Sequence, residues 1–150
     1  MIEAYFDGVT EPVNPGGFCA YGAVIFVDRK EIWREGKMIV MQEGNEKMTS
    51  NNLAEYSGFV RILEKLVELK LQDESIIIRG DSNLVIHQMF ASWKIKNGYY
   101  VEKAMKAKEL LKSFSSIIGQ WIPREQNSIA DEISKDVLRK AGVEFRIQPE

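Results

Sequence analysis

Polar and apolar residues alternate along the first part of the chain, and this two-residue period predicts β-strands. The alternation is clear at residues 2–6, and residues 18–27 are rich in the β-branched and aromatic side chains that strands favour. A third strand is predicted at residues 32–41, after a short polar turn. Residues 10–17 contain two prolines and two glycines, which predicts a loop. We therefore expect the chain to begin with a three-stranded antiparallel meander.

The rest of the chain alternates between helical and strand patterns. Apolar residues between positions 53 and 67 recur every three or four positions, which predicts an amphipathic helix that opens near Ser50 or Asn51. The apolar run at residues 76–78 predicts a short strand buried on both faces. This order favours an α/β fold in which a mixed sheet is flanked by helices. The remaining elements are expected to be helices at 82–92, 99–112 and 127–141 and a strand at 116–122.

Length and composition narrow the class of protein. The chain has 150 residues, 45% of them hydrophobic, so we expect a single domain (residues 1–150) with a substantial core. The net charge of -2 does not by itself indicate a nucleic-acid binder. The lone Cys19 excludes an intrachain disulfide, and neither a signal-peptide pattern nor a membrane-spanning apolar stretch is evident. We expect a soluble, cytoplasmic protein, and a monomer because no long apolar stripe is left over.

Four of the 22 acidic residues stand out by their place in the predicted elements. Asp7 is predicted to end the first strand, and Asp81 follows the apolar strand at 76–78. In open α/β sheets, chemistry gathers beyond the carboxyl ends of strands. Glu55 falls early in the first helix beside its apolar stripe, and Asp131 falls early in the last helix. These four acids are therefore the candidate active centre.

An acid at the edge of a core face is costly unless a cation compensates for its charge. Hard divalent ions such as Mg²⁺ prefer oxygen ligands. Two such ions held close together activate a water molecule and stabilise the leaving oxygen in phosphodiester hydrolysis. Four carboxylates without a Cys or His cluster fit this chemistry and argue against zinc. The residues therefore predict a metal-dependent nuclease.

Short motifs surround these acids. They are Tyr-Phe-Asp-Gly at 5–8 with Asn-Pro-Gly-Gly at 14–17, Thr-Ser-Asn-Asn-Leu-Ala-Glu-Tyr at 49–56, Gly-Asp-Ser-Asn-Leu-Val-Ile at 80–86, and Trp-Ile-Pro-Arg-Glu-Gln-Asn-Ser-Ile-Ala-Asp at 121–131. Together and in this order they resemble the type 1 ribonuclease H family over nearly the whole chain. The resemblance implies the ribonuclease H-like fold, a five-stranded mixed sheet of three antiparallel and then parallel strands flanked by helices.

The resemblance also implies an activity and a role for each acid. Asp7 would bridge two Mg²⁺ or Mn²⁺ ions, and Asp131 would complete the coordination of the ion that activates water. Glu55 and Asp81 would hold the ion beside the leaving 3′ oxygen. The expected reaction is endonucleolytic hydrolysis of the RNA strand of RNA–DNA hybrids, which leaves 5′-phosphate and 3′-hydroxyl ends.

Several polar residues fall where the family reads the RNA strand through its minor groove. The 2′-hydroxyl separates RNA from DNA, and short amides both donate to it and accept from it. The alternative is that these are ordinary loop and cap residues. The candidates for substrate binding are Asn14, Ser50, Asn51, Asn52 and Asn83.

The sequence departs from the better-known members in two places. Arg124 stands where they carry a mobile histidine, as in one branch of the family. It would hold the phosphate or assist product departure, unless it is a plain surface arginine, and His87 is expected to be structural or exposed. The basic protrusion is missing. Trp93, Lys94 and Lys96 form a reduced patch for the DNA strand, unless Trp93 belongs to the core.

Two other functions stay open at this stage. A site that reads mainly the RNA strand would also accept double-stranded RNA. A non-catalytic hybrid-binding module would keep the fold but lose one or more of the acids, and none is lost here.

Overall fold

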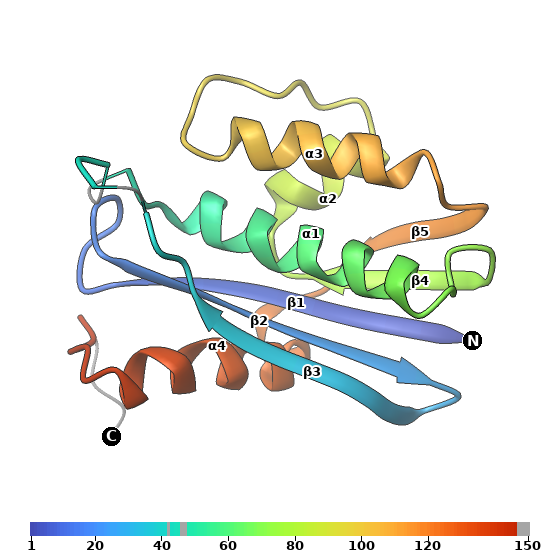
Figure 1. The fold of residues 1–150 in the computed structure, drawn as a ribbon, viewed down its shortest axis with the longest axis horizontal. Coiled ribbons are helices and arrows are strands. Elements are labelled where there is room, and N and C mark those ends of the chain that lie inside the picture. The colour runs from blue at the N-terminus through green and yellow to red at the C-terminus, as the bar shows by residue number, and fades with distance from the viewer. Residues whose placement is uncertain (42, 46–47, 147–150) are drawn as a thin grey trace.

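One five-stranded mixed sheet organises the chain, and the computed structural model describes it over residues 1–41, 43–45 and 48–146 (Figure 1). The strand order is β3-β2-β1-β4-β5. The first three strands are antiparallel, whereas β4 runs parallel to β1 and β5 parallel to β4. This confirms the predicted sheet. The strands are β1 (Ile2–Glu11), β2 (Phe18–Val27), β3 (Lys30–Met38), β4 (Ser75–Gly80) and β5 (Ser116–Trp121).

Helices cover the sheet unequally. Three helices lie on one face and α4 lies alone on the other (Figure 1). Within the described ranges, none of them is both long enough and apolar enough to cross a membrane. The helices are α1 (Asn51–Glu68), α2 (Asn83–Phe90), α3 (Val101–Leu111) and α4 (Ser128–Lys140), with a 3-10 turn at Arg124–Gln126.

The main core lies between the central strand β1 and helix α1. Side chains of Ala4 and Phe6 on one face of β1 are fully buried. The ring of Phe6 packs edge-to-face against Phe59 of α1, with 5.3 Å between centroids. Tyr56 of α1 stacks on Tyr100, which precedes α3. Aromatic packing therefore anchors α1, and the N-terminal half of α1 is held against the centre of the sheet.

Strand β1 is longer than the sequence pattern predicted. It continues through Asp7 to Glu11, because these residues pair with β2 up to Phe18. The expectation that Asp7 ends the strand was therefore wrong, as was the loop predicted at residues 10 and 11. The parallel pairing with β4, however, stops at Tyr5. Asp7 therefore lies in the middle of its own strand but just past the end of β4.

Other boundaries shifted by a few residues. Strand β3 ends at Met38 rather than at residue 41, and α4 begins at Ser128 rather than at residue 127. Both Ser50 and Ser82 cap their helices, since each hydroxyl accepts a hydrogen bond from the backbone three residues later. Ile77 is only half buried because α4 packs mainly over β1, β2 and β3. The predicted burial of both faces of β4 was therefore wrong at this residue.

Helix α4 packs against β2 where the strand carries a glycine. A Cβ atom at Gly22 would overlap the carbonyl oxygen of Ala130, whereas one at Gly36 would meet mainly side-chain methyls of α4. We expect Gly22→Ala to lower the free energy of unfolding by about 1–3 kcal/mol, because a strained backbone contact must open. The cost of Gly36→Ala should be clearly smaller. Urea denaturation of both variants tests this, and equal costs would contradict it.

Candidate metal centre

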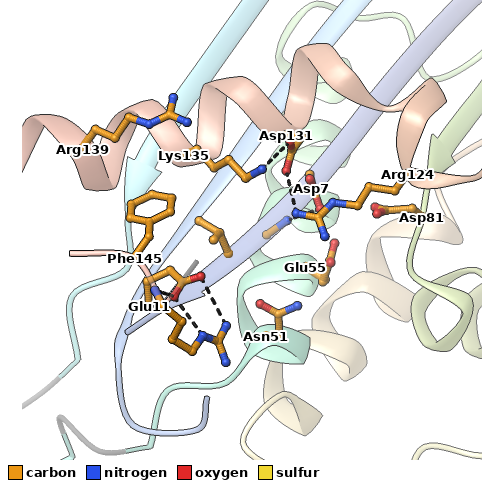
Figure 2. Close-up of a pocket in the computed structure, with 13 residues that line it drawn as sticks. Asp7, Glu11, Asn51, Glu55, Asp81, Arg124, Asp131, Lys135, Arg139 and Phe145 are labelled. Carbon is orange, nitrogen blue, oxygen red and sulfur yellow. Dashed lines mark hydrogen bonds and ion pairs between the residues drawn. The ribbon is translucent and has the colours of Figure 1, made fainter. Parts of the chain in front are cut away.

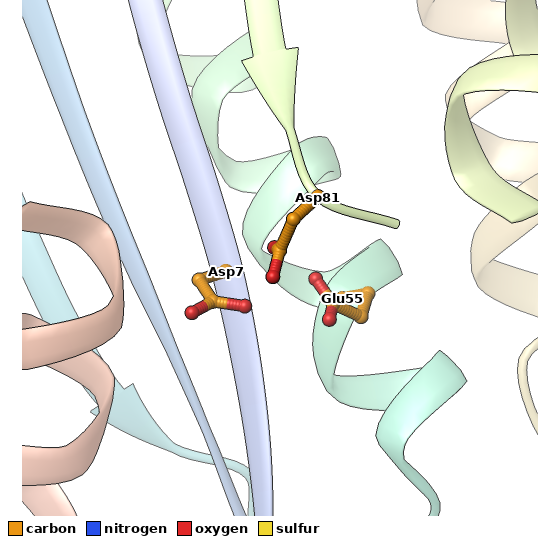
Figure 3. A group of neighbouring side chains, drawn as sticks. All are labelled: Asp7, Glu55 and Asp81. Carbon is orange, nitrogen blue, oxygen red and sulfur yellow. The ribbon is translucent and has the colours of Figure 1, made fainter. Parts of the chain in front are cut away.

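Three carboxylates from separate elements converge at one edge of the central strands (Figure 3). Asp7 comes from the middle of β1, Glu55 from the second turn of α1, and Asp81 from the residue after β4. Each offers one oxygen, and these oxygens all lie within 4.8 Å of one another. The three residues are 26 to 74 positions apart in the chain, so only the parallel pairing of β1 with β4 and the packing of α1 bring them together.

A glycine lets the helix approach the strand at this point. A Cβ atom at Gly8 would lie 2.5 Å from the backbone nitrogen of Glu55, so any other residue would push α1 away from β1. The backbone N–H of Gly8 also donates to Oδ1 of Asp7 at 2.9 Å. The close approach buries Asp7 and Glu55 almost completely, and Oε2 of Glu55 is buried without a hydrogen-bond partner.

Burial and mutual repulsion change the acidity of the group. The pKa of Asp7 is raised from 3.8 to about 8, first by burial and then by the charges of Asp81 and Asp131. Burial, followed by the charge of Asp7, raises the pKa of Glu55 well above its ordinary value. Full ionisation of this group therefore needs a compensating positive charge, and a cation would supply it.

A buried asparagine holds the third carboxylate in place. Asn127, which is 1% exposed, donates from Nδ2 to the carbonyl oxygen of Phe6 at 2.9 Å and to Oδ1 of Asp81 at 3.1 Å. The indole of Trp121 donates to the carbonyl oxygen of Asp81 at 3.1 Å. Neither residue was singled out from the sequence. The signal available was the place of Asn127 directly before the last helix, within the motif that contains Asp131.

Asp131 stands beside the group of three rather than within it. It lies in the first turn of α4, close enough to Asp7 for its charge to raise the pKa of that residue. Its carboxylate lies 2.9 Å from Nζ of Lys135 and 3.8 Å from Nη2 of Arg124 (Figure 2). All four acids and both cations line one cleft.

The polar residues proposed to bind RNA lie at different distances from this cleft. Asn51 lines it, and its backbone N–H is bound by Oδ1 of Asn14 at 3.0 Å. This contact joins the loop between β1 and β2 to the start of α1. Ser50 uses its hydroxyl as the cap of α1, and Asn52 is exposed. Asn83 is exposed at the start of α2.

The residues proposed for the DNA strand follow α2. Trp93 is 50% exposed and therefore is not a core residue, in contrast to the alternative drawn from the sequence. Its ring stacks on His87 with 4.5 Å between centroids, and Nδ1 of His87 lies 2.7 Å from the carbonyl oxygen of Asn83. Lys94 and Lys96 are exposed beside the stacked pair.

The donor set fits a hard divalent cation. The three clustered ligand atoms are carboxylate oxygens, and no cysteine or histidine joins them in the described part of the chain. Mg²⁺ and Mn²⁺ favour such ligands, whereas zinc sites in proteins usually include nitrogen or sulfur. Oε2 of Glu55 has no hydrogen-bond partner, and the pKa values of Asp7 and Glu55 are raised. Both features fit a site built to hold a cation.

Comparisons with known proteins show the family to which the chain belongs. A family model described as reverse transcriptase-like matches residues 16–137. The bifunctional protein Rv2228c of Mycobacterium tuberculosis is 32% identical over 142 residues, which cover 94% of this chain and 36% of that protein. Ribonuclease HI of Halobacterium salinarum is 31% identical over 93% of this chain and 65% of its own length. The chain thus spans about a third of the mycobacterial relative.

A solved structure extends the likeness to three dimensions. LC11-RNase H1, crystallised in complex with an RNA/DNA hybrid, superposes with a TM-score of 0.80 and 30% identity, covering 94% of this chain and 99% of that one. Fold and carboxylate site together define a ribonuclease H-like domain. The chain belongs to the reverse transcriptase-like family, and it is similar to ribonuclease HI and RNase H1 proteins, as the sequence motifs predicted.

The raised pKa of Asp7 predicts how stability depends on pH without metal. A carboxyl group with a higher pKa in the folded state stabilises the fold below its unfolded pKa, and this contribution is lost as the pH rises toward about 8. In a chelator, we expect the wild type to lose at least about 2 kcal/mol of stability between pH 5 and pH 8.

Urea denaturation at each pH measures this loss. Asp7→Asn should flatten the dependence, and Asp136→Asn, at a half-exposed position of α4 outside the cleft, should not. Saturating Mn²⁺ should remove most of the difference, because a bound cation favours the ionised carboxylates. A wild-type stability that stays constant over this pH range in chelator would contradict the prediction.

Proposed function

We propose that the chain is a metal-dependent endonuclease that hydrolyses the RNA strand of RNA–DNA hybrids, with two Mg²⁺ or Mn²⁺ ions and 5′-phosphate and 3′-hydroxyl products. The observation that carries the proposal is the cluster of Asp7, Glu55 and Asp81, in which Glu55 has an unpaired acceptor and the buried Asp7 and Glu55 have raised pKa values. Such a group is costly to bury for packing alone. It is useful when cations and a phosphate meet there.

The four acids would hold the cations from different positions in the cleft. Asp7 faces both the clustered acids and Asp131, so it is the residue suited to be shared between two ions. Divalent cations in such a site supply an activated water and stabilise charge on the leaving oxygen. Asn127 keeps the carboxylate of Asp81 oriented, and Gly8 keeps α1 close enough for Glu55 to take part.

The choice of an RNA-containing substrate is supported by the neighbours of the acids. Asn51 lines the cleft next to Glu55, and its backbone N–H donates to Oδ1 of Asn14. Amide side chains in such a place donate to and accept from a ribose 2′-hydroxyl. The likeness to LC11-RNase H1, which was solved with an RNA/DNA hybrid, supports the same substrate.

The opposite strand would lie on the exposed patch that follows α2. Trp93 presents an aromatic face for sugars or bases, and Lys94 and Lys96 add positive charge for phosphates. A patch with two lysines contributes modest affinity that falls as salt rises.

Cleavage of a labelled hybrid in Mg²⁺ or Mn²⁺ tests the proposal. We expect the wild type to cut the RNA strand internally and to leave the DNA strand intact. Asp7→Asn should reduce the rate by at least about a hundredfold, because it removes one charge from the shared ligand. Asp136→Asn, at a half-exposed position of α4 outside the cleft, is the matched control and should cut like the wild type.

The same experiment includes an RNA duplex and a DNA duplex of the same sequence. End analysis should find 5′-phosphate and 3′-hydroxyl products from the hybrid. Cutting of the RNA duplex would widen the substrate to double-stranded RNA. Tight hybrid binding without cleavage in either metal would instead indicate a non-catalytic binding module and would sink the proposed activity.

Arg124 is proposed to assist the departure of the cleaved phosphate. Its guanidinium is 68% exposed and lies 3.8 Å from Asp131, at the mouth of the cleft. A charged hydrogen bond contributes about 1.5–3 kcal/mol, so Arg124→Ala should slow steady-state turnover roughly tenfold or more. If the role is product departure, the single-turnover rate should stay near that of the wild type. The exposed Arg34→Ala on β3 serves as control, and equal turnover in both variants would refute a role for Arg124.

A further inference from the structure

Lys135 lies inside the cleft, beside Asp131, the acid that is not one of the three clustered carboxylates. It follows Asp131 by one turn of α4, and its Nζ lies 2.9 Å from Oδ2 of that residue. Only 23% of the lysine side chain and 19% of the aspartate side chain are exposed, so solvent ions screen this pair less than a surface pair. In Figure 2 the ammonium points from the helix toward Asp131. The fourth acid therefore already has a cation of its own.

The other cations of the cleft are engaged differently. Arg139 and Arg146 each pair with a glutamate outside the four-carboxylate set, at 2.5 Å and 2.9 Å. Arg124 also faces Asp131, but at 3.8 Å and largely in solvent. Lys135 is therefore the cation that most directly neutralises a member of the set.

The group of three has no such neighbour. In the described ranges, none of the ion pairs within 4.0 Å involves Asp7, Glu55 or Asp81. Glu55 even keeps a buried oxygen without a partner. A divalent cation therefore reaches this group without replacing a protein cation, whereas at Asp131 it meets an ammonium already in contact with the carboxylate.

We propose that Lys135 competes with a divalent cation for Asp131, and that it thereby makes the two cation positions of the site unequal in affinity. The inference rests on the proposed function in taking the four carboxylates as cation ligands. The physical basis is that a unit positive charge in contact with a ligand both shares its attraction and repels an incoming cation. Lys135 thus stays paired with Asp131 until a cation binds at the lower-affinity position.

Two substitutions remove the charge with little change of shape. Lys135→Met keeps the apolar stem that packs along α4, and Lys135→Gln keeps a hydrogen-bond donor without the charge. Lys135→Arg keeps the charge. Binding of Mn²⁺ to each folded protein, without nucleic acid, is measured by isothermal titration calorimetry.

The dissociation constant of the lower-affinity Mn²⁺ position should fall on the order of tenfold in the Met and Gln variants, because the repulsion between the lysine and the incoming cation is lost. The dissociation constant of the higher-affinity position should change much less, and Lys135→Arg should bind Mn²⁺ as the wild type does. The Mn²⁺ concentration for half-maximal hybrid cleavage should fall in the same variants.

The chain contains a matched control on the same helix. Lys140 follows Asp136 by the same four residues and lies 2.9 Å from it, but this pair is outside the cleft and the lysine is 78% exposed. Lys140→Met should therefore bind Mn²⁺ as the wild type does. Thermal melting in chelator checks that every variant is folded.

Three results would overturn the inference. The first is Mn²⁺ binding at the lower-affinity position that is unchanged or weaker in the Met and Gln variants. The second is an equal gain in Mn²⁺ affinity in Lys140→Met. The third is a single bound ion in every protein. Its failure is distinct from that of the proposed function. Tighter Mn²⁺ binding in the variants without hybrid cleavage by any protein would contradict the proposed activity but support the role of Lys135. Hybrid cleavage with unchanged Mn²⁺ binding would support the activity but contradict the role of Lys135.

Discussion

Repulsion between buried carboxylates is the constraint on which the arrangement of the site depends. Asp7, Glu55 and Asp81 each offer an oxygen within 4.8 Å of the others, and burial already opposes the charges of Asp7 and Glu55. The surrounding structure holds them there despite that cost. Gly8 admits α1 to the strand, Asn127 ties Asp81 to β1, and aromatic packing anchors α1. Rigid elements with locked contacts are what such a strained group requires.

The charge of the cleft is graded rather than uniform. The group of three, of which Asp7 and Glu55 are buried, has no ion-pair partner in the described ranges, whereas Asp131 is paired with Lys135 and faces Arg124. Asp7 connects the two parts, because charges on both sides raise its pKa. This gradient explains why four acids of one kind need not play one role. Their common chemistry is oxygen ligation, but their electrostatic surroundings differ.

Much of the fold was readable from local patterns. The order of strands and helices, the cap near Ser50, and the antiparallel start all follow from periodicity and cap chemistry. The errors at β1 and β4 have one physical cause, which is contact with another segment of the chain. Strand β1 runs on to Glu11 because β2 pairs with it there, and Ile77 stays half exposed because α4 packs mainly over β1, β2 and β3. The periodicity of one segment records neither contact, because each depends on a second segment.

The same division holds for the site. The sequence by itself determined which acids and motifs are present, and hence the family and the expected oxygen-ligand chemistry. Only the tertiary structure decided that Asp131 stands apart with Lys135, that Asn127 orients Asp81, and that Trp93 is exposed. The reason is that side-chain identity is local, whereas burial and electrostatic coupling depend on distances between segments far apart in the chain. Composition can name the ligands of a metal centre, but only packing sets their charge state.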